Sequence, residues 1–144
     1  MPTRAVPETI GPAPAVREAN QRFYAAFHSL DIAKMSSVWL QEDWIQCVHP
    51  GWDLIIGWDE IRDSWARIFA NTRRIQIALS GVRVHAEGDV AWVACTEHIT
   101  SAFESSFDEA LVQATNMFVL REGAWYLVGH HASLLLNVPE SKVQ

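Results

Sequence analysis

The sequence predicts an α+β domain in which three N-terminal helices pack on one long, strongly curved and mostly antiparallel sheet. Two observations predict it. Apolar residues recur at helical spacing in the first half of the chain, and four long segments rich in β-branched and aromatic residues follow one another in the second half. Helices followed by a series of strands are typical of α+β folds. Strands this long curl, so we expect a cone with a central pocket.

The composition fits one globular domain and excludes several partners. The chain has 144 residues, of which 49% are hydrophobic and 19% charged, with a formal net charge of −6. This charge leaves no basic surface for nucleic acid. No apolar run approaches the roughly 18 residues that a membrane span needs, and the N-terminus lacks a signal-peptide pattern. We therefore expect a cytoplasmic protein without nucleic-acid or membrane partners.

The pattern places one domain between two short ends. Residues 1–14 hold four of the six prolines and read as a loosely ordered arm, residues 15–137 form the domain, and residues 138–144 form a tail. Cys47 and Cys95 lie in apolar runs, which predicts two buried thiols rather than a disulfide.

Three helices are predicted in the first half of the domain. The first begins at Ala15 and carries an apolar stripe on one side. Asp31 is expected to cap a second helix that runs to about Trp39. Asp59 is a plausible cap for the third helix, which should end near Asn71.

The predicted strands are two short ones, 44–49 and 54–56, and four long ones, 75–86, 90–103, 110–121 and 124–136. Glu87-Gly88 and Glu122-Gly123 suit tight two-residue turns. If the second turn has two residues, Phe118 pairs with Leu127.

The same register pairs Asn116 with Gly129, and a glycine there leaves space. Alternation then turns His130 away and predicts a small hollow whose wall carries an amide, an imidazole and a hydroxyl. The residues on that face are Asn116, Phe118, Trp125, Leu127, Gly129, His131 and Ser133.

Two stretches of the chain resemble the nuclear transport factor 2-like superfamily, which includes SnoaL-like cyclases, ketosteroid isomerase, limonene epoxide hydrolase and the association domain of calcium/calmodulin-dependent kinase. The first stretch is the string CVHPGW at 47–52, similar to a bacterial branch that carries the same string; Gly57 and Ser64-Trp65 follow it. The second is 114–118 with the last strand, 123–133. The resemblance covers about 15–133. It implies a ligand held between the concave sheet face and the helices.

Four residues are candidates for acid–base chemistry: Glu97, His49, His131 and Asn116. Glu97 interrupts an apolar strand, and burial would raise its pKa into a useful range. Alternatively, it pairs with an arginine or faces solvent, and a bulge could exchange it with His98. His49 is a candidate base or a strand-end histidine bonded to backbone. Asn116 and His131 would donate hydrogen bonds to developing charge.

Aromatic residues are expected to contact the ligand. Trp39, Trp52 and Trp65 come from three segments that should converge over the mouth of the cone, although plain core packing explains them as well. The remaining predicted ligand contacts are Phe27, Phe118 and Ser133.

No metal and no cofactor are expected. The six histidines form no H-E-x-x-H string, and no cysteine pair has ligand spacing. No glycine-rich phosphate loop or dinucleotide fingerprint is found either.

These features favour a cofactor-free lyase, isomerase or hydrolase that acts on a small, mostly apolar molecule. One alternative is a non-catalytic ligand-binding or dimerisation module. Another comes from the last strand, which is similar to that of iota-class carbonic anhydrases and so implies a carbonic anhydrase-like activity in which Ser133 helps to hold bicarbonate. The outer sheet face is expected to be apolar and to pair in a homodimer. Its residues include Met117, Val119, Tyr126 and Val128.

Overall fold

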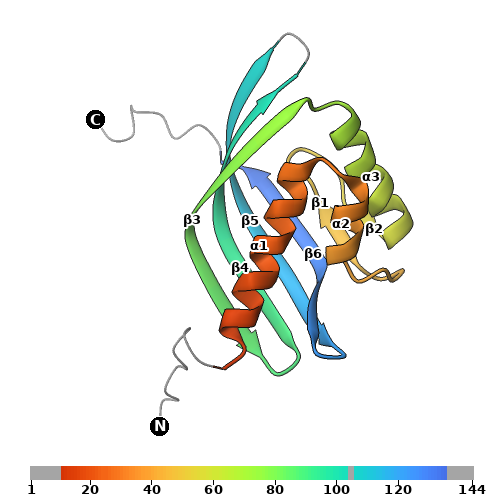
Figure 1. Cartoon of the computed structure of the whole chain (residues 1–144), viewed down its shortest axis with the longest axis vertical. Helices are drawn as coiled ribbons and strands as arrows, with labels where there is room; N and C mark the ends of the chain where they lie inside the picture. The colour runs from red at the N-terminus through yellow and green to blue at the C-terminus, as the bar shows by residue number, and fades with distance from the viewer. Residues whose placement is uncertain (1–10, 104–105, 136–144) are drawn as a thin grey trace.

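The computed structural model describes residues 11–103 and 106–135. Within them, three helices lie on one side of a strongly curved sheet (Figure 1), so the predicted α+β fold is confirmed. The elements in order are α1 Ala13–Ser29, α2 Ile32–Val38, β1 Gln46–Val48, β2 Ile55–Ile56, α3 Trp58–Ala70, β3 Arg74–Glu87, β4 Val90–Ala102, β5 Phe107–Arg121 and β6 Ala124–Leu134. The predicted arm (1–14) and tail (138–144) lie mostly or wholly outside the described residues.

The helix starts follow local chemistry. Helix α1 begins at Ala13, two residues earlier than predicted. Pro14 is tolerated in the first turn because backbone N–H groups have no partner within the helix at that position, so the N–H that proline lacks is not missed. The predicted Asp31 cap is confirmed, since its Oδ1 accepts the Ala33 N–H at 2.8 Å. Helix α3 follows Gly57, so Asp59 lies in its first turn rather than at the cap.

The sheet has the order β2-β1-β6-β5-β4-β3, and only the β1–β6 pair is parallel. Helix α1 packs against β3, β4 and β6, while α3 contacts β1 and β2. The core lies between the helices and the inner, concave face of the sheet. No helix in the described part of the chain is long and apolar enough to cross a membrane.

A β-bulge at Val128 changes the register of the last hairpin. Phe118 pairs with Leu127 as predicted, but Met117 pairs with Gly129 and Asn116 pairs with His130. The predicted Asn116–Gly129 pair is therefore wrong, because counting by twos allows no extra residue.

The bulge also exchanges the two adjacent histidines. His130 is buried on the inner face, whereas His131 and Ser133 are exposed on the outer face. The expectation that His131 and Ser133 share the inner face is thus wrong.

The two hairpin turns differ from each other. The Glu122-Gly123 turn is confirmed by the pairing of Arg121 with Ala124. The first hairpin pairs Glu87 with Val90, so its turn is Gly88-Asp89 rather than Glu87-Gly88.

The Glu122-Gly123 turn places a non-glycine residue in a strained backbone conformation. Glu122 has φ 51° and Gly123 has φ 84°, the left-handed geometry that tight hairpins favour and glutamate does not. We expect Glu122→Asn, which completes the preferred Asn-Gly pair, to stabilise the fold by about 0.5–1 kcal/mol. Urea denaturation measures the change. Glu42→Asn, at an exposed position without positive φ, removes the same charge and should show no gain; an equal gain there would contradict the strain argument.

Candidate functional site

A largely apolar cavity of about 430 Å³ opens between α3, the loop after β1 and the inner faces of β3 and β4. Only two of its lining residues have charged side chains, Arg67 and Glu97. The lining residues are Phe27, His49, Pro50, Trp52, Arg67, Ile68, Asn71, Thr72, Ile75, Glu97, Ile99, Ser101, Phe103 and His130.

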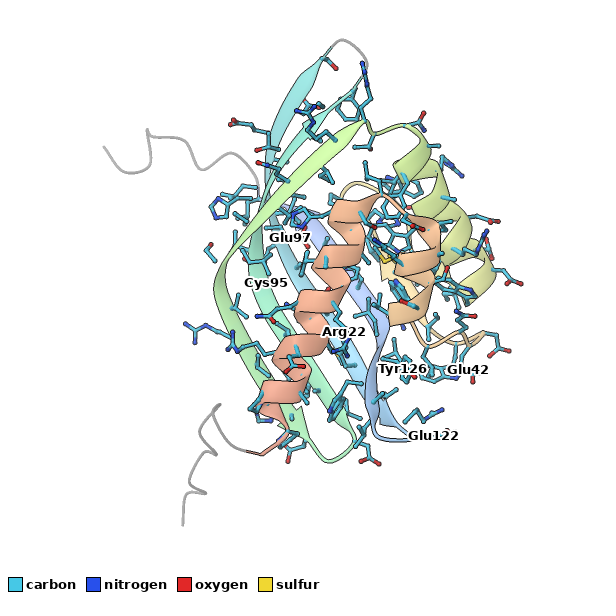
Figure 2. All side chains as sticks on the ribbon, in the orientation of Figure 1. Arg22, Glu42, Cys95, Glu97, Glu122 and Tyr126 are labelled. Carbon is cyan, nitrogen blue, oxygen red and sulfur yellow. The ribbon has the colours of Figure 1, made fainter. Side chains whose placement is uncertain are left out.

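Glu97 is the acid of this cavity. It lies on the inner face of β4 and is 1% exposed, and Figure 2 shows it beside α1. Burial raises the pKa of Glu97 to about 7, although the hydrogen bond that Tyr24 Oη donates to its Oε2 opposes the rise. Its neighbour His98 is exposed, and the Nε2 atom of His98 lies 3.0 Å from Ser80 Oγ. Glu97 is therefore the residue of this pair that faces inward.

Asn116 connects the acid to His130 through buried hydrogen bonds. Its Nδ2 donates to Asn20 Oδ1 at 2.8 Å and to Tyr24 Oη at 3.1 Å. Its Oδ1 accepts from His130 Nδ1 at 2.6 Å. The bonds therefore run in one direction, from His130 through Asn116 and Tyr24 to Glu97. Both end residues line the cavity.

This series of hydrogen bonds fixes the tautomer of His130. Because the Asn116 oxygen can only accept, His130 Nδ1 carries the hydrogen and Nε2 holds the lone pair. Burial lowers the pKa of His130 to about 3, so the ring is neutral at pH 7.

A second pair fixes the tautomer of His49. Ser64 Oγ donates its single hydrogen to the Ile61 carbonyl at 2.6 Å, so it must accept from His49 Nε2 at 2.8 Å. Burial lowers the pKa of His49 to about 4. Neither cavity imidazole has an N–H left to donate to a ligand. The inner end of the cavity therefore holds two neutral imidazoles and one carboxyl group, and the unprotonated Nδ1 of His49 lies 3.9 Å from Cys47 Sγ.

The other predicted site residues separate into two groups. Asn116 is fully buried and reaches the cavity only through its partners, whereas Phe27 and Trp52 line it directly. Trp39, Trp65 and Phe118 are buried but are not among the lining residues, which fits the core-packing alternative. Ser133 and His131 lie on the opposite face of the sheet.

Sequence reasoning missed Asn20, Tyr24, His130 and Arg67. Asn20 and Tyr24 are one turn apart on α1, so a polar pair at i and i+4 beside the apolar stripe was an available signal. His130 was missed because of the bulge, which the sequence does not announce.

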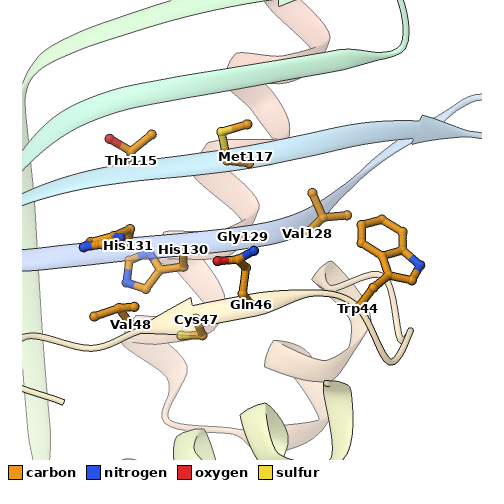
Figure 3. Close-up of a pocket in the computed structure, with 10 residues that line it drawn as sticks. All are labelled: Trp44, Gln46, Cys47, Val48, Thr115, Met117, Val128, Gly129, His130 and His131. Carbon is orange, nitrogen blue, oxygen red and sulfur yellow. The ribbon is translucent and has the colours of Figure 1, made fainter. Parts of the chain in front are cut away.

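A second hollow, of about 470 Å³, lies on the outer face of the sheet (Figure 3). Trp44, Gln46, Thr115, Met117 and His131 contribute to its walls. His130, one end of the hydrogen-bond network, lines this hollow too, but Glu97, Tyr24 and Asn116 do not, and His131 there is exposed. The buried acid therefore makes the inner cavity the stronger candidate for a functional site.

Among the described residues, no three His, Cys, Asp or Glu side chains lie close enough together to hold a metal ion. The ring centroids of His49 and His130 are 6.3 Å apart.

The family follows from the match of the whole domain. The model of the SnoaL-like domain family matches residues 16–137. The chain belongs to the SnoaL-like domain family. A nuclear transport factor 2-like protein from Streptomyces avermitilis, named as a candidate dehydratase, is 36% identical with a TM-score of 0.84, covering 92% of this chain and 100% of that one.

Two further proteins are similar to this SnoaL-like chain. A candidate calcium/calmodulin-dependent protein kinase type II association domain from Thiobacillus denitrificans is 27% identical with a TM-score of 0.74, covering 83% of this chain and 94% of that one. The F-box protein SKIP8 of Arabidopsis thaliana is 26% identical over 122 residues. That match covers 85% of this chain and 50% of SKIP8, so the chain spans half the length of this relative.

The buried network predicts the effect of removing its central amide. Asn116→Leu leaves the His130 N–H and the Asn20 carbonyl without partners, so we expect a loss of about 2–4 kcal/mol of unfolding free energy. Urea denaturation measures it. The control is Thr115→Val, on the outer side of the same strand, which should change stability by less than about 1 kcal/mol. Unchanged stability of Asn116→Leu would show that the network does not hold α1 to the sheet.

Proposed function

We propose that this SnoaL-like protein is a cofactor-free acid–base enzyme that acts on a small, mostly apolar molecule in the inner cavity. The observation that carries the proposal is Glu97, a buried carboxyl on the cavity wall whose pKa lies near 7. A group with this pKa is present in both protonation states at neutral pH, which is the condition for efficient general base and general acid catalysis.

The geometry supports a division of roles within the carboxyl group. Tyr24 donates to Oε2 and leaves Oε1 for the substrate. Burial raises the pKa of Tyr24, so it stays a phenol and keeps donating this bond. The ionised Glu97 takes a proton from a substrate carbon. The acid formed returns that proton either to another carbon, which is an isomerisation, or to a leaving hydroxyl group, which releases water.

The two imidazoles indicate which substrate group could bind at the inner end. Donors for an oxyanion, which the tetrahedral intermediate of a hydrolase and the enolate of a lyase or isomerase both need, must come from other groups of the cavity. His49 and His130 can only accept a hydrogen bond from a ligand. Asn116, expected as a donor, gives its amide hydrogens to Asn20 and Tyr24. Two acceptors suit a substrate that brings a hydroxyl group. The candidate-dehydratase name of the Streptomyces avermitilis protein agrees with this direction.

The carbonic anhydrase alternative loses its proposed anchor. Ser133, expected to hold bicarbonate, lies exposed on the outer face of β6, away from the cavity. A non-catalytic ligand-binding module would need the cavity but not a carboxyl group whose pKa is raised by burial. The Glu97 variant described below therefore distinguishes it from the enzyme.

Proton transfer can be tested without knowing the substrate. The protein is incubated in heavy water with a panel of small cyclic ketones and β-hydroxy ketones, and deuterium incorporation beside the carbonyl is followed by NMR. We expect exchange whose rate rises with pH through about 7 and then levels off, because the base must be ionised.

The matched variants locate the base. Glu97→Gln should lower the exchange rate by at least about 100-fold, the usual contribution of a positioned base. Glu18→Gln, which removes an exposed carboxylate from α1, should leave it unchanged. Absence of exchange across the panel, or equal rates for Glu97→Gln and the unaltered protein, would reject the enzyme and favour the binding module.

We also propose that the protein pairs with a second copy through the outer face of the sheet. Apolar side chains meet there across two neighbouring strands, β4 and β5, in the pairs Val90–Val119 and Trp92–Met117, and Trp92 is 37% exposed in the single chain. Exposed apolar surface of this kind favours association.

Light scattering tests the pairing. We expect about twice the mass of one chain at micromolar concentration, and a single-chain mass for Trp92→Glu, because the charge would be buried against the partner. Gln76→Glu adds the same charge to the outer side of the edge strand β3 and should remain paired. A single-chain mass for the unaltered protein would contradict the proposal.

A further inference from the structure

We propose that Arg67 and Trp52 form an anion site at the mouth of the inner cavity, so that the ligand is a small apolar molecule with a carboxylate at its outer end. This inference names the substrate class of the cavity and rests on its proposed function.

The guanidinium group of Arg67 is positioned by an aromatic ring. Its Cζ lies 5.2 Å from the centroid of the Trp52 ring, and both residues line the cavity. An arginine held over an aromatic face by a cation–π contact still has N–H groups that can bind a carboxylate. The contact also reduces the side-chain freedom that binding would otherwise remove.

Arg67 does not use the acidic partner that its own helix offers. Asp63 lies one turn earlier on α3, the usual place for an i,i+4 ion pair. Its carboxylate lies instead 4.0 Å from Arg62, and no ion pair with Arg67 forms within residues 11–103 and 106–135. The Asn71 amide, also on the cavity wall, donates to the backbone oxygen of Arg67 and leaves the guanidinium free. The guanidinium group of Arg67 is therefore available to bind an anionic ligand.

The rest of the cavity fixes the orientation of such a ligand. Its inner end holds Glu97 and the two acceptor imidazoles, which repel a carboxylate or give it no donor. Ile68, Ile75 and Ile99 supply apolar wall. A carboxylate is thus accepted at Arg67 and rejected at Glu97, so the reacting end of the molecule points inward.

The experiment compares two ligands that differ in charge and hardly in shape. 3-Phenylpropanoate and 3-phenylpropanamide are titrated into the unaltered protein at pH 8 and low salt, and binding is followed by protein NMR. We expect the acid to bind about 5-fold more tightly than the amide, the upper end of the range for one partly exposed charge pair. The preference should shrink at about 0.5 M salt, where exposed charges are screened.

Two variants on the same helix identify the residue. Arg67→Gln should abolish the preference for the acid while leaving the affinity for the amide unchanged. Arg62→Gln removes an exposed charge that does not line the cavity and should keep the preference. Arg67→Lys, which keeps the charge but loses the planar fork, should retain part of it. The far-UV spectrum of each variant confirms that the fold is kept.

The outcomes separate this inference from the proposed function. Equal affinities for acid and amide, a preference that survives Arg67→Gln, or no binding of either compound at about 10 mM would each overturn the anion site. None of these results alters the exchange test of Glu97, which decides the acid–base proposal by itself. If the protein prefers the acid to the amide but shows no exchange activity, the anion site stands and the acid–base proposal is rejected.

Discussion

The hydrogen bonds of the Asn116 amide are the interaction on which the rest of the site depends. One side chain on β5 binds Asn20 and Tyr24 of α1 and His130 of β6, and Tyr24 extends the network to Glu97 on β4. All of these groups are buried, so each bond that is lost leaves a polar atom without a partner. The same contacts therefore dock the helix and orient the reactive groups.

Burial gives the cavity its chemistry by opposing charge in all of its inner groups. It raises the pKa of Glu97 and lowers those of His49 and His130. The acid is thereby brought near neutrality while both imidazoles remain acceptors. The hydrogen-bond partners then select one tautomer for each ring. An inner end with an acid and no cation, and an arginine at the mouth, give the cavity two ends of different polarity, which supports the proposed ligand with one apolar and one anionic end.

Membership of the SnoaL-like family accounts for the cone and for a cavity under the helices, but not for the chemistry. The proposals rest on the particular side chains that this chain places there. Glu97 and the two imidazoles lie at the inner end, and Arg67 lies over Trp52 at the mouth. The outer face offers a separate apolar surface around Trp92, so the proposed association and the proposed chemistry would lie on opposite sides of one sheet.

Local chemistry determined the fold class, the Asp31 cap and the Glu122-Gly123 turn, because periodicity, capping and turn propensities act over a few residues. Glu97 could be named for the same reason, since a carboxylate inside an apolar strand is visible in the sequence. The inward position of His130 was decided by tertiary structure alone. Along its other edge, β6 changes partner at Val128: Leu127 bonds to the backbone of Leu40, and from Gly129 onward the strand pairs with β1. That exchange accompanies the bulge and involves residues more than 80 positions apart, beyond the reach of any local pattern.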